Sequence, residues 1–171
     1  MQYLLFDGKE REALLPFTYT RPVARLRIGI DRIQDKWEAF LEQKCDLLTV
    51  DYLSKKYPPK FSSVQTFINA AFLPTAKVVS QIQQLKEGEV LLYKNEVVAV
   101  VSTAKVPPTE WQPKDALHWE EDLLHLDDKT KLFLLNEAVI KEDFHRLTQG
   151  RKSAEIPTTN QVISPENIFI E

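Results

Sequence analysis

A short stretch near the N-terminus concentrates three hydroxyl groups and three guanidinium groups. The set comprises Thr18, Tyr19, Thr20, Arg21, Arg25 and Arg27. A guanidinium presents a planar fork of hydrogen-bond donors that matches phosphate oxygens, so this stretch has the chemistry to hold a phosphate group. The residues alone leave a second interpretation open, in which the arginines pair with surface acids while Pro16 and Pro22 stiffen a loop.

The position of this stretch in the chain favours ligand binding. The apolar residues 3–6, followed by Asp7 and Gly8, predict a buried strand that ends in a turn. In an open α/β sheet, ligands bind at the carboxyl ends of the strands, and the long irregular segment 9–27 begins there. Asn69 closes another predicted strand, at residues 64–69. Its side chain could bond a sugar or a base, or its own backbone in a turn.

The rest of the pattern alternates strands with helices. One amphipathic helix is predicted by five apolar residues at helical spacing, which are Ile30, Ile33, Trp37, Phe40 and Leu41. Lys36 is expected on its polar face. Further strands are predicted at residues 47–50, 89–94 and 97–102, the last two as a hairpin. Further helices are predicted at 52–57 after an Asp51 cap, between Thr75 and Gly88, and at 129–147 with a break near Asn136. This order predicts an α/β domain with a mainly parallel sheet.

Composition narrows the functional classes. The 171 residues are 43% hydrophobic and 27% charged, as in an ordinary folded domain. The net charge of -3 argues against a nucleic-acid-binding protein. A single cysteine, Cys45, excludes an internal disulfide framework. Because neither a signal-like N-terminus nor an apolar run of membrane-spanning length is present, a cytoplasmic setting is expected, with no membrane or nucleic-acid partner.

The histidines and two of the tryptophans carry no specific functional pattern. His118 and His125 lie seven residues apart, whereas two metal ligands on one helix face need a spacing of three or four. We therefore expect a solvated acidic face there, and the residues predict no metal site. Trp111 and Trp119 are expected in the core, with a protein-interaction surface as the alternative.

The segment from Leu14 to Pro22 reads Leu-x-Pro-Phe-Thr-x-x-Arg-Pro. It resembles the Leu-x-Pro-Leu-Thr…Pro-Lys segment of sugar-phosphate nucleotidyltransferases, which join a sugar 1-phosphate to a nucleoside triphosphate. More closely, the chain resembles sugar nucleotidyltransferases of Bacteroidetes that are related to the N-acetylglucosamine-1-phosphate uridyltransferase family. The similarity covers residues 14–37, 51–53, 67–69, 136, 143–144, 150–153 and 165–169.

This resemblance implies a Rossmann-like domain of the nucleotide-diphospho-sugar transferase type. It also implies a nucleotide or sugar phosphate bound near Thr18, Arg21, Arg25 and Asn69, and Mg²⁺ as cofactor if the domain is active. By the same resemblance, residues 1–153 form the nucleotidyltransferase-like domain. Residues 154–171 are then a linker and the start of a left-handed β-helix, through which the full-length protein would form a trimer. Within that tail, apolar residues recur six apart, as in a β-helix: Val162 with Ile168, and Ile163 with Phe169.

Three substitutions affect the chemistry that the resemblance implies. Ala13 stands where the arginine of the phosphate loop is expected, and Val23 where the lysine after proline is expected. Ala71 replaces the aspartate that holds Mg²⁺. Nucleotidyl transfer depends on positioning and on cations that neutralise developing charge, so the sequence leaves open whether the domain is an enzyme and assigns no catalytic residue. The alternative is a non-catalytic structural or regulatory domain attached to a β-helix of the acyltransferase type.

Overall fold

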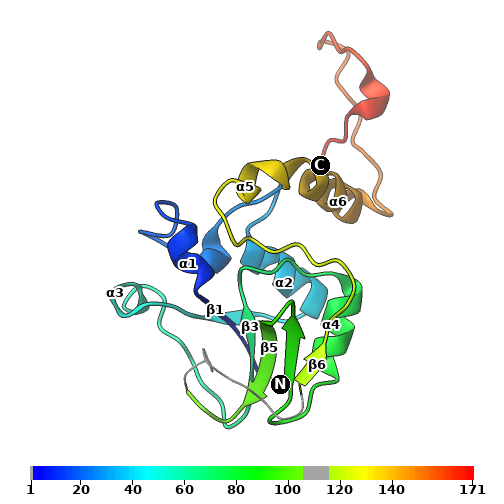
Figure 1. Ribbon diagram of the computed structural model, residues 1–171. Coiled ribbons are helices and arrows are strands. Elements are labelled where there is room, and N and C mark those ends of the chain that lie inside the picture. The colour runs from blue at the N-terminus through cyan, green and yellow to red at the C-terminus, as the bar shows by residue number, and fades with distance from the viewer. Residues whose placement is uncertain (1, 106–115) are drawn as a thin grey trace.

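A six-stranded mixed sheet lies at the centre of the computed structural model, which describes residues 2–105 and 116–171 (Figure 1). The strands are β1 (Gln2–Phe6), β2 (Cys45–Leu48), β3 (Gln65–Asn69), β4 (Val90–Tyr93), β5 (Glu96–Ser102) and β6 (Ala116–His118). Their order is β2-β1-β3-β5-β4-β6. β1 runs parallel to both β2 and β3, and β6 runs parallel to β4, whereas β5 is antiparallel to its two neighbours. The mixed α/β fold with a mostly parallel sheet is therefore confirmed.

The helices connect the strands. They are α1 (Glu10–Ala13), α2 (Ile33–Leu41), α3 (Asp51–Ser54), α4 (Ala76–Gln83), α5 (Lys131–Leu134) and α6 (Asn136–Thr148), with single 3-10 turns η1 (Val23–Arg25) and η2 (Pro165–Asn167). Of these, α2 and α4 pack on one face of the sheet. Alternate residues of β1 point to opposite faces. Leu5 belongs to the larger core, which contains Trp37 of α2 and Val78 of α4, and Leu4 belongs to a smaller cluster with Phe67.

Several local predictions are confirmed. The Thr75 hydroxyl accepts a hydrogen bond from the Val78 amide (3.2 Å) and caps α4. The predicted hairpin is formed by β4 and β5, and its turn residues Lys94 and Asn95 have positive φ angles of 50° and 68°. This left-handed backbone is the conformation that a two-residue hairpin loop requires. The predicted break near Asn136 separates α5 from α6.

Some predicted helix boundaries are wrong. Ile30 lies in a loop, and α2 begins only at Ile33, because the N-cap Arg32 has an extended backbone (φ -73°, ψ 157°) and forms an antiparallel bridge with Arg27. Asp51 does not cap α3; Val50 is the N-cap, and Asp51 is the first helical residue. The irregular segment 9–27 contains α1 and η1. Within the described ranges, no helix combines the length and apolar character that a membrane crossing requires.

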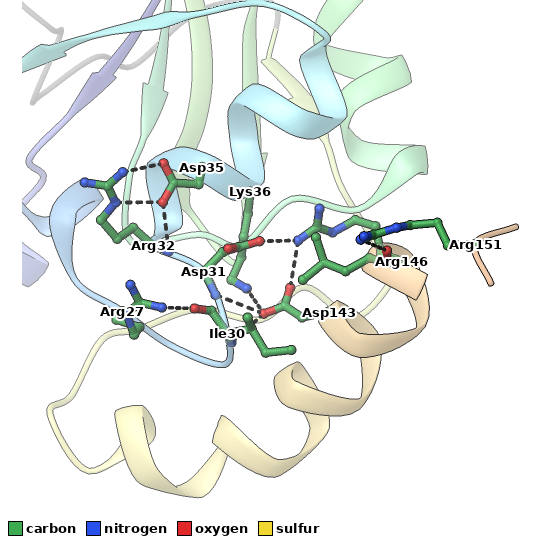
Figure 2. A network of polar contacts seen from close by, with 10 residues as sticks. Arg27, Ile30, Asp31, Arg32, Asp35, Lys36, Asp143, Arg146 and Arg151 are labelled. Atoms are coloured by element: carbon green, nitrogen blue, oxygen red, sulfur yellow. Dashed lines mark hydrogen bonds and ion pairs between the residues drawn. The ribbon is translucent and has the colours of Figure 1, made fainter. Parts of the chain in front are cut away.

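A buried network of ion pairs and hydrogen bonds connects α6 with α2 and the loop before it (Figure 2). Asp143, only 3% exposed, forms an ion pair with Lys36 of α2, which is equally buried. The Asp143 carboxylate also accepts the Ile30 amide (2.9 Å) and lies 3.3 Å from Arg146, whose other partner is Asp31 (2.5 Å). The prediction that Lys36 faces solvent is therefore wrong, because α6 supplies its counter-ion.

Gly29 is required where this network meets the loop. The Gly29 amide donates to Asn136 Oδ1 (2.7 Å), and a Cβ atom at residue 29 would lie 2.5 Å from an Asp143 oxygen and 2.7 Å from a Val139 methyl carbon. The close approach and the positive φ therefore both select glycine at this position.

Candidate functional site

Four cationic side chains line one pocket on the β1–β2 side of the structure. This pocket has a volume of about 260 Å³, and we call it the basic pocket; its lining residues are Thr20, Arg21, Arg25, Arg32, Lys56 and Tyr57. Arg21 and Arg25 come from the connection between β1 and α2, Arg32 from the N-cap of α2, and Lys56 from the turn after α3. Two segments that are distant in sequence, residues 20–32 and residues 56–57, therefore contribute positive charge to one cavity.

Two cationic side chains of the pocket lie against one aromatic ring, and a third forms an ion pair with a carboxylate. The Arg25 guanidinium carbon and the Lys56 Nζ atom lie 5.6 and 5.4 Å from the centroid of the Tyr57 ring. Arg32 is paired with Asp35 through two hydrogen bonds (2.7 and 2.9 Å), and this pairing raises the pKa of Arg32. Arginine remains charged at physiological pH in any case, so the pocket is positively charged and suited to anions.

The structure brings Arg21 and Arg25 together but keeps Thr18 and Asn69 out of this pocket. Thr18 is fully buried, and its hydroxyl donates to the Arg11 carbonyl (2.8 Å). Asn69 is 4% exposed; its Oδ1 accepts the Ala71 amide (3.0 Å) and its Nδ2 lies 3.2 Å from a Glu10 oxygen. Both side chains thus bond the protein itself, and Asn69 makes the local turn bond that the sequence left as an alternative.

Asp7 anchors the connection that carries the two pocket arginines. It follows β1 directly, and its side chain is 4% exposed. Its carboxylate accepts the Val23 amide (2.8 Å) and the Thr49 hydroxyl (2.6 Å). Burial raises the pKa of Asp7 despite these bonds and the nearby Arg11 guanidinium (3.5 Å). Asp7 therefore ties β1 to η1 and to the end of β2, and it fixes the position of Arg25 in η1.

A second pocket contains acidic side chains and a histidine. It has a volume of about 470 Å³, and we call it the acid–histidine pocket; its lining residues are Lys9, Glu10, Ala13, Lys94, Glu96, His125 and Asp127. His125 Nε2 lies 2.9 Å from a carboxylate oxygen of Glu10, which is 3% exposed. The imidazole stacks on Phe72, with ring centroids 4.0 Å apart and an angle of 12° between the planes.

No pattern in the sequence predicts this second pocket. The expectation of a solvated acidic face is wrong for His125, whose side chain is 12% exposed, although His118 is exposed as expected. Glu10 and His125 are 115 residues apart. They meet because Phe72 and His125 form an antiparallel backbone bridge, which places the imidazole above the carboxyl ends of β1 and β3. Trp119 packs against the core, as expected, and Trp111 lies outside the described residues.

The ionisation of Glu10 makes folding pH-dependent. Burial raises the pKa of Glu10, but hydrogen bonds from His125, its own backbone and Asn69 outweigh burial and leave the pKa lowered. A lowered folded-state pKa stabilises the protein above the unfolded value of about 4.3, and this stabilisation is lost as the pH falls through the folded-state pKa. We therefore expect Glu10→Gln to destabilise the protein by about 1–3 kcal/mol at pH 7 and by progressively less toward pH 4 and below.

Urea unfolding of the native protein and of Glu10→Gln, measured at intervals from pH 7 to pH 3.5, tests this expectation. The control is Glu87→Gln, which removes an exposed carboxylate and is expected to change stability by less than about 0.5 kcal/mol at every pH. A difference between Glu10→Gln and the native protein that stays constant over this range would contradict the assignment.

The fold and the pockets define a class of protein, and one comparison gives the family. The structure is a mixed α/β domain with a mostly parallel sheet and with pockets lined by the connection that follows β1. The model of the family described as sugar nucleotidyl transferase matches residues 3–152, so the chain belongs to that family. A crystal structure of a Bacillus anthracis protein, assigned as a glucose-1-phosphate thymidylyltransferase and solved in complex with sucrose, is similar at 12% identity. The match covers 82% of this chain and 95% of that chain, with a TM-score of 0.48. No curated protein matches the sequence.

The residues do not fit the Mg²⁺ site that the resemblance implies. Across residues 2–105 and 116–171, no group of three or more His, Cys, Asp or Glu side chains could hold a metal ion. Both oxygens of Asp7 already accept hydrogen bonds from the protein. Ala13 lines the acid–histidine pocket and Ala71 is fully buried, and a methyl group can ligate no cation.

Proposed function

We propose that this domain binds a nucleotide or a sugar phosphate without a divalent metal, with phosphate groups in the basic pocket. The observation that carries the proposal is the convergence of Arg21, Arg25, Arg32 and Lys56 on one cavity. Guanidinium and ammonium groups bind phosphate directly and need no metal to do so. Membership of the sugar nucleotidyl transferase family supports a ligand of this class.

In the same proposal, the acid–histidine pocket takes the hydroxyl-rich end of the ligand. Carboxylates accept hydrogen bonds from hydroxyl groups, and Glu10, Glu96 and Asp127 supply them there. Both pockets are lined by the segment that follows β1, which contributes Lys9, Glu10 and Ala13 to one and Thr20, Arg21 and Arg25 to the other. The segment that follows β1 therefore contributes to both parts of the proposed ligand site.

Catalysis is expected to be absent or very weak. Transfer of a nucleotidyl group to a sugar phosphate brings many negative charges together, and the family's chemistry relies on cations to neutralise them. In this chain the positions expected to supply a loop arginine, a lysine and a metal carboxylate hold Ala13, Val23 and Ala71. Substantial Mg²⁺-dependent release of pyrophosphate from a nucleoside triphosphate and a sugar 1-phosphate would overturn this part of the proposal.

Calorimetric titration of the chain with uridine and thymidine triphosphates, with Mg²⁺ and with EDTA, tests the binding. We expect similar affinities under both conditions and a loss of about tenfold on Arg21→Ala, because one charged hydrogen bond is removed. The control is Arg151→Ala, which removes the same charge from a side chain outside the pocket. An unchanged affinity of Arg21→Ala would remove Arg21 from the site.

The alternative that we retain is a non-catalytic structural or regulatory domain, cytoplasmic and joined to a β-helix that assembles as a trimer. The cytoplasmic setting and the closer relationship to the Bacteroidetes proteins and to N-acetylglucosamine-1-phosphate uridyltransferases are proposed whichever of the two functions holds. The exposed tail after α6 supports the alternative: Ile163 is 87% exposed, and the segment projects away from the sheet (Figure 1). Absence of nucleotide binding in the same titrations would favour this alternative.

A further inference from the structure

Tyr52, on α3, presents an aromatic ring beside the basic pocket. Tyr52 is 59% exposed, although aromatic residues contribute most to stability when they are buried. It lies four residues before Lys56, which lines the pocket. Its hydroxyl donates to the carbonyl of Tyr19 (2.8 Å), the residue before Thr20 of the pocket wall. The ring is therefore exposed to solvent close to the cationic side chains.

A buried arginine fixes the orientation of this ring. Arg11 is 7% exposed, and its Nη2 donates both to the Tyr52 hydroxyl (2.6 Å) and to the Thr18 carbonyl (2.6 Å). The guanidinium carbon lies 5.7 Å from the centroid of the Tyr52 ring, and Asp7 lies 3.5 Å from Arg11 Nε. An aromatic side chain held in this way is already ordered, so a ligand that stacks on it loses less free energy to ordering than on a mobile ring.

We propose that a nucleobase stacks on Tyr52 while the phosphates of the same nucleotide lie in the basic pocket. This proposal rests on the nucleotide-binding function proposed above. The Tyr57 ring already has two cations against it, Arg25 and Lys56, whereas Tyr52 remains 59% exposed with Arg11 against its ring. An inorganic phosphate would gain nothing from an exposed ring, but every nucleobase has a π-face that stacks on an aromatic side chain.

Recognition by stacking has a consequence for selectivity. A stacked base is bound through the area of its π-face and not through the hydrogen-bonding pattern of its edge. Because a purine has a larger π-face than a pyrimidine, adenine and guanine nucleotides are expected to bind more tightly than uracil or thymine nucleotides. Tyr52 then determines the preference for purine nucleotides, and the basic pocket binds the phosphates of purine and pyrimidine nucleotides alike.

Titration of the whole chain in EDTA with ATP, GTP, UTP, dTTP and inorganic tripolyphosphate tests the proposal. Tripolyphosphate carries at least as much negative charge as the nucleotides but has no base. We expect ATP and GTP to bind roughly tenfold more tightly than tripolyphosphate. The affinities of UTP and dTTP should lie between that of tripolyphosphate and those of ATP and GTP. Tyr52→Leu should reduce the nucleotide affinities to that of tripolyphosphate and leave tripolyphosphate unaffected. Tyr52→Phe, which keeps the ring, should retain most of the purine preference.

The outcomes separate this proposal from the function on which it rests. If tripolyphosphate binds as tightly as ATP to the native protein, stacking is refuted and phosphate binding stands. If neither tripolyphosphate nor any nucleotide binds, the proposed function itself is refuted. A purine preference that survives in Tyr52→Leu, with an unchanged circular dichroism spectrum, would exclude Tyr52 as the stacking surface.

Discussion

Replacement of Asp143 by alanine is expected to destabilise the domain by about 3–5 kcal/mol, because it leaves the buried Lys36 ammonium without a counter-ion. Lys36 is 3% exposed, so water cannot replace the lost carboxylate without opening the contact between α2 and α6. The same change removes an acceptor for the Ile30 amide and a partner of Arg146. Urea unfolding at pH 7, followed by circular dichroism, measures the loss.

The matched control for Asp143→Ala lies on the same helix. Glu137 forms an exposed ion pair with Lys141 one helical turn away, and Glu137→Ala is expected to cost less than about 0.5 kcal/mol, as for other exposed pairs of this spacing. The double variant Lys36→Met with Asp143→Leu is expected to recover part of the loss, since it removes the unpaired charge as well as its partner. Equal effects of Asp143→Ala and Glu137→Ala would show that the network contributes nothing specific.

The sequence predicts the elements of this fold well because local patterns determine them. The apolar run that ends at Phe6 is too short and too uniformly apolar for a surface helix, and β1 occupies it. The helical spacing of Ile33, Trp37 and Leu41 predicts the buried face of α2, which the structure confirms. Asn95 marks the hairpin turn. In each case the signal lies within a few residues of the structure that it predicts.

The sequence predicts less of the site, because contacts between distant residues determine it. Arg21 and Arg25 were identified from their chemistry and share a pocket, but Lys56 joins them only through the fold. Thr18 is a candidate phosphate-binding residue for the same chemical reason, yet the Thr18 hydroxyl donates a hydrogen bond to the Arg11 carbonyl and does not line the pocket.

Contacts between residues that are distant in sequence also explain why the environment of some polar residues is predicted wrongly. Lys36 has a polar position in the helical pattern of α2 and is nevertheless buried, because its partner Asp143 is 107 residues away. The pair of Glu10 and His125 spans 115 residues. Helical or strand periodicity cannot reveal pairings at such separations, since they depend on how α6 and the segment after β6 return to the sheet.

Replacement of Trp37 by alanine is expected to cost about 3–5 kcal/mol of unfolding free energy, the range for large aromatic side chains truncated in a core. Trp37 is fully buried between α2 and the sheet, and its Nε1–H donates to the Phe72 carbonyl (3.0 Å).

The Trp37 variants also test how the core supports the acid–histidine pocket. Because the Phe72 ring stacks on His125, loss of the tryptophan should loosen that pocket as well as the core. Trp37→Phe keeps most of the apolar contact but leaves the Phe72 carbonyl without this donor, so an intermediate loss of about 1–3 kcal/mol is expected. Urea unfolding of both variants, with hydrogen exchange of the amides around residue 125, measures the two effects. A loss below about 1 kcal/mol for Trp37→Ala, within the range of surface substitutions, would show that Trp37 does not support the core in this way.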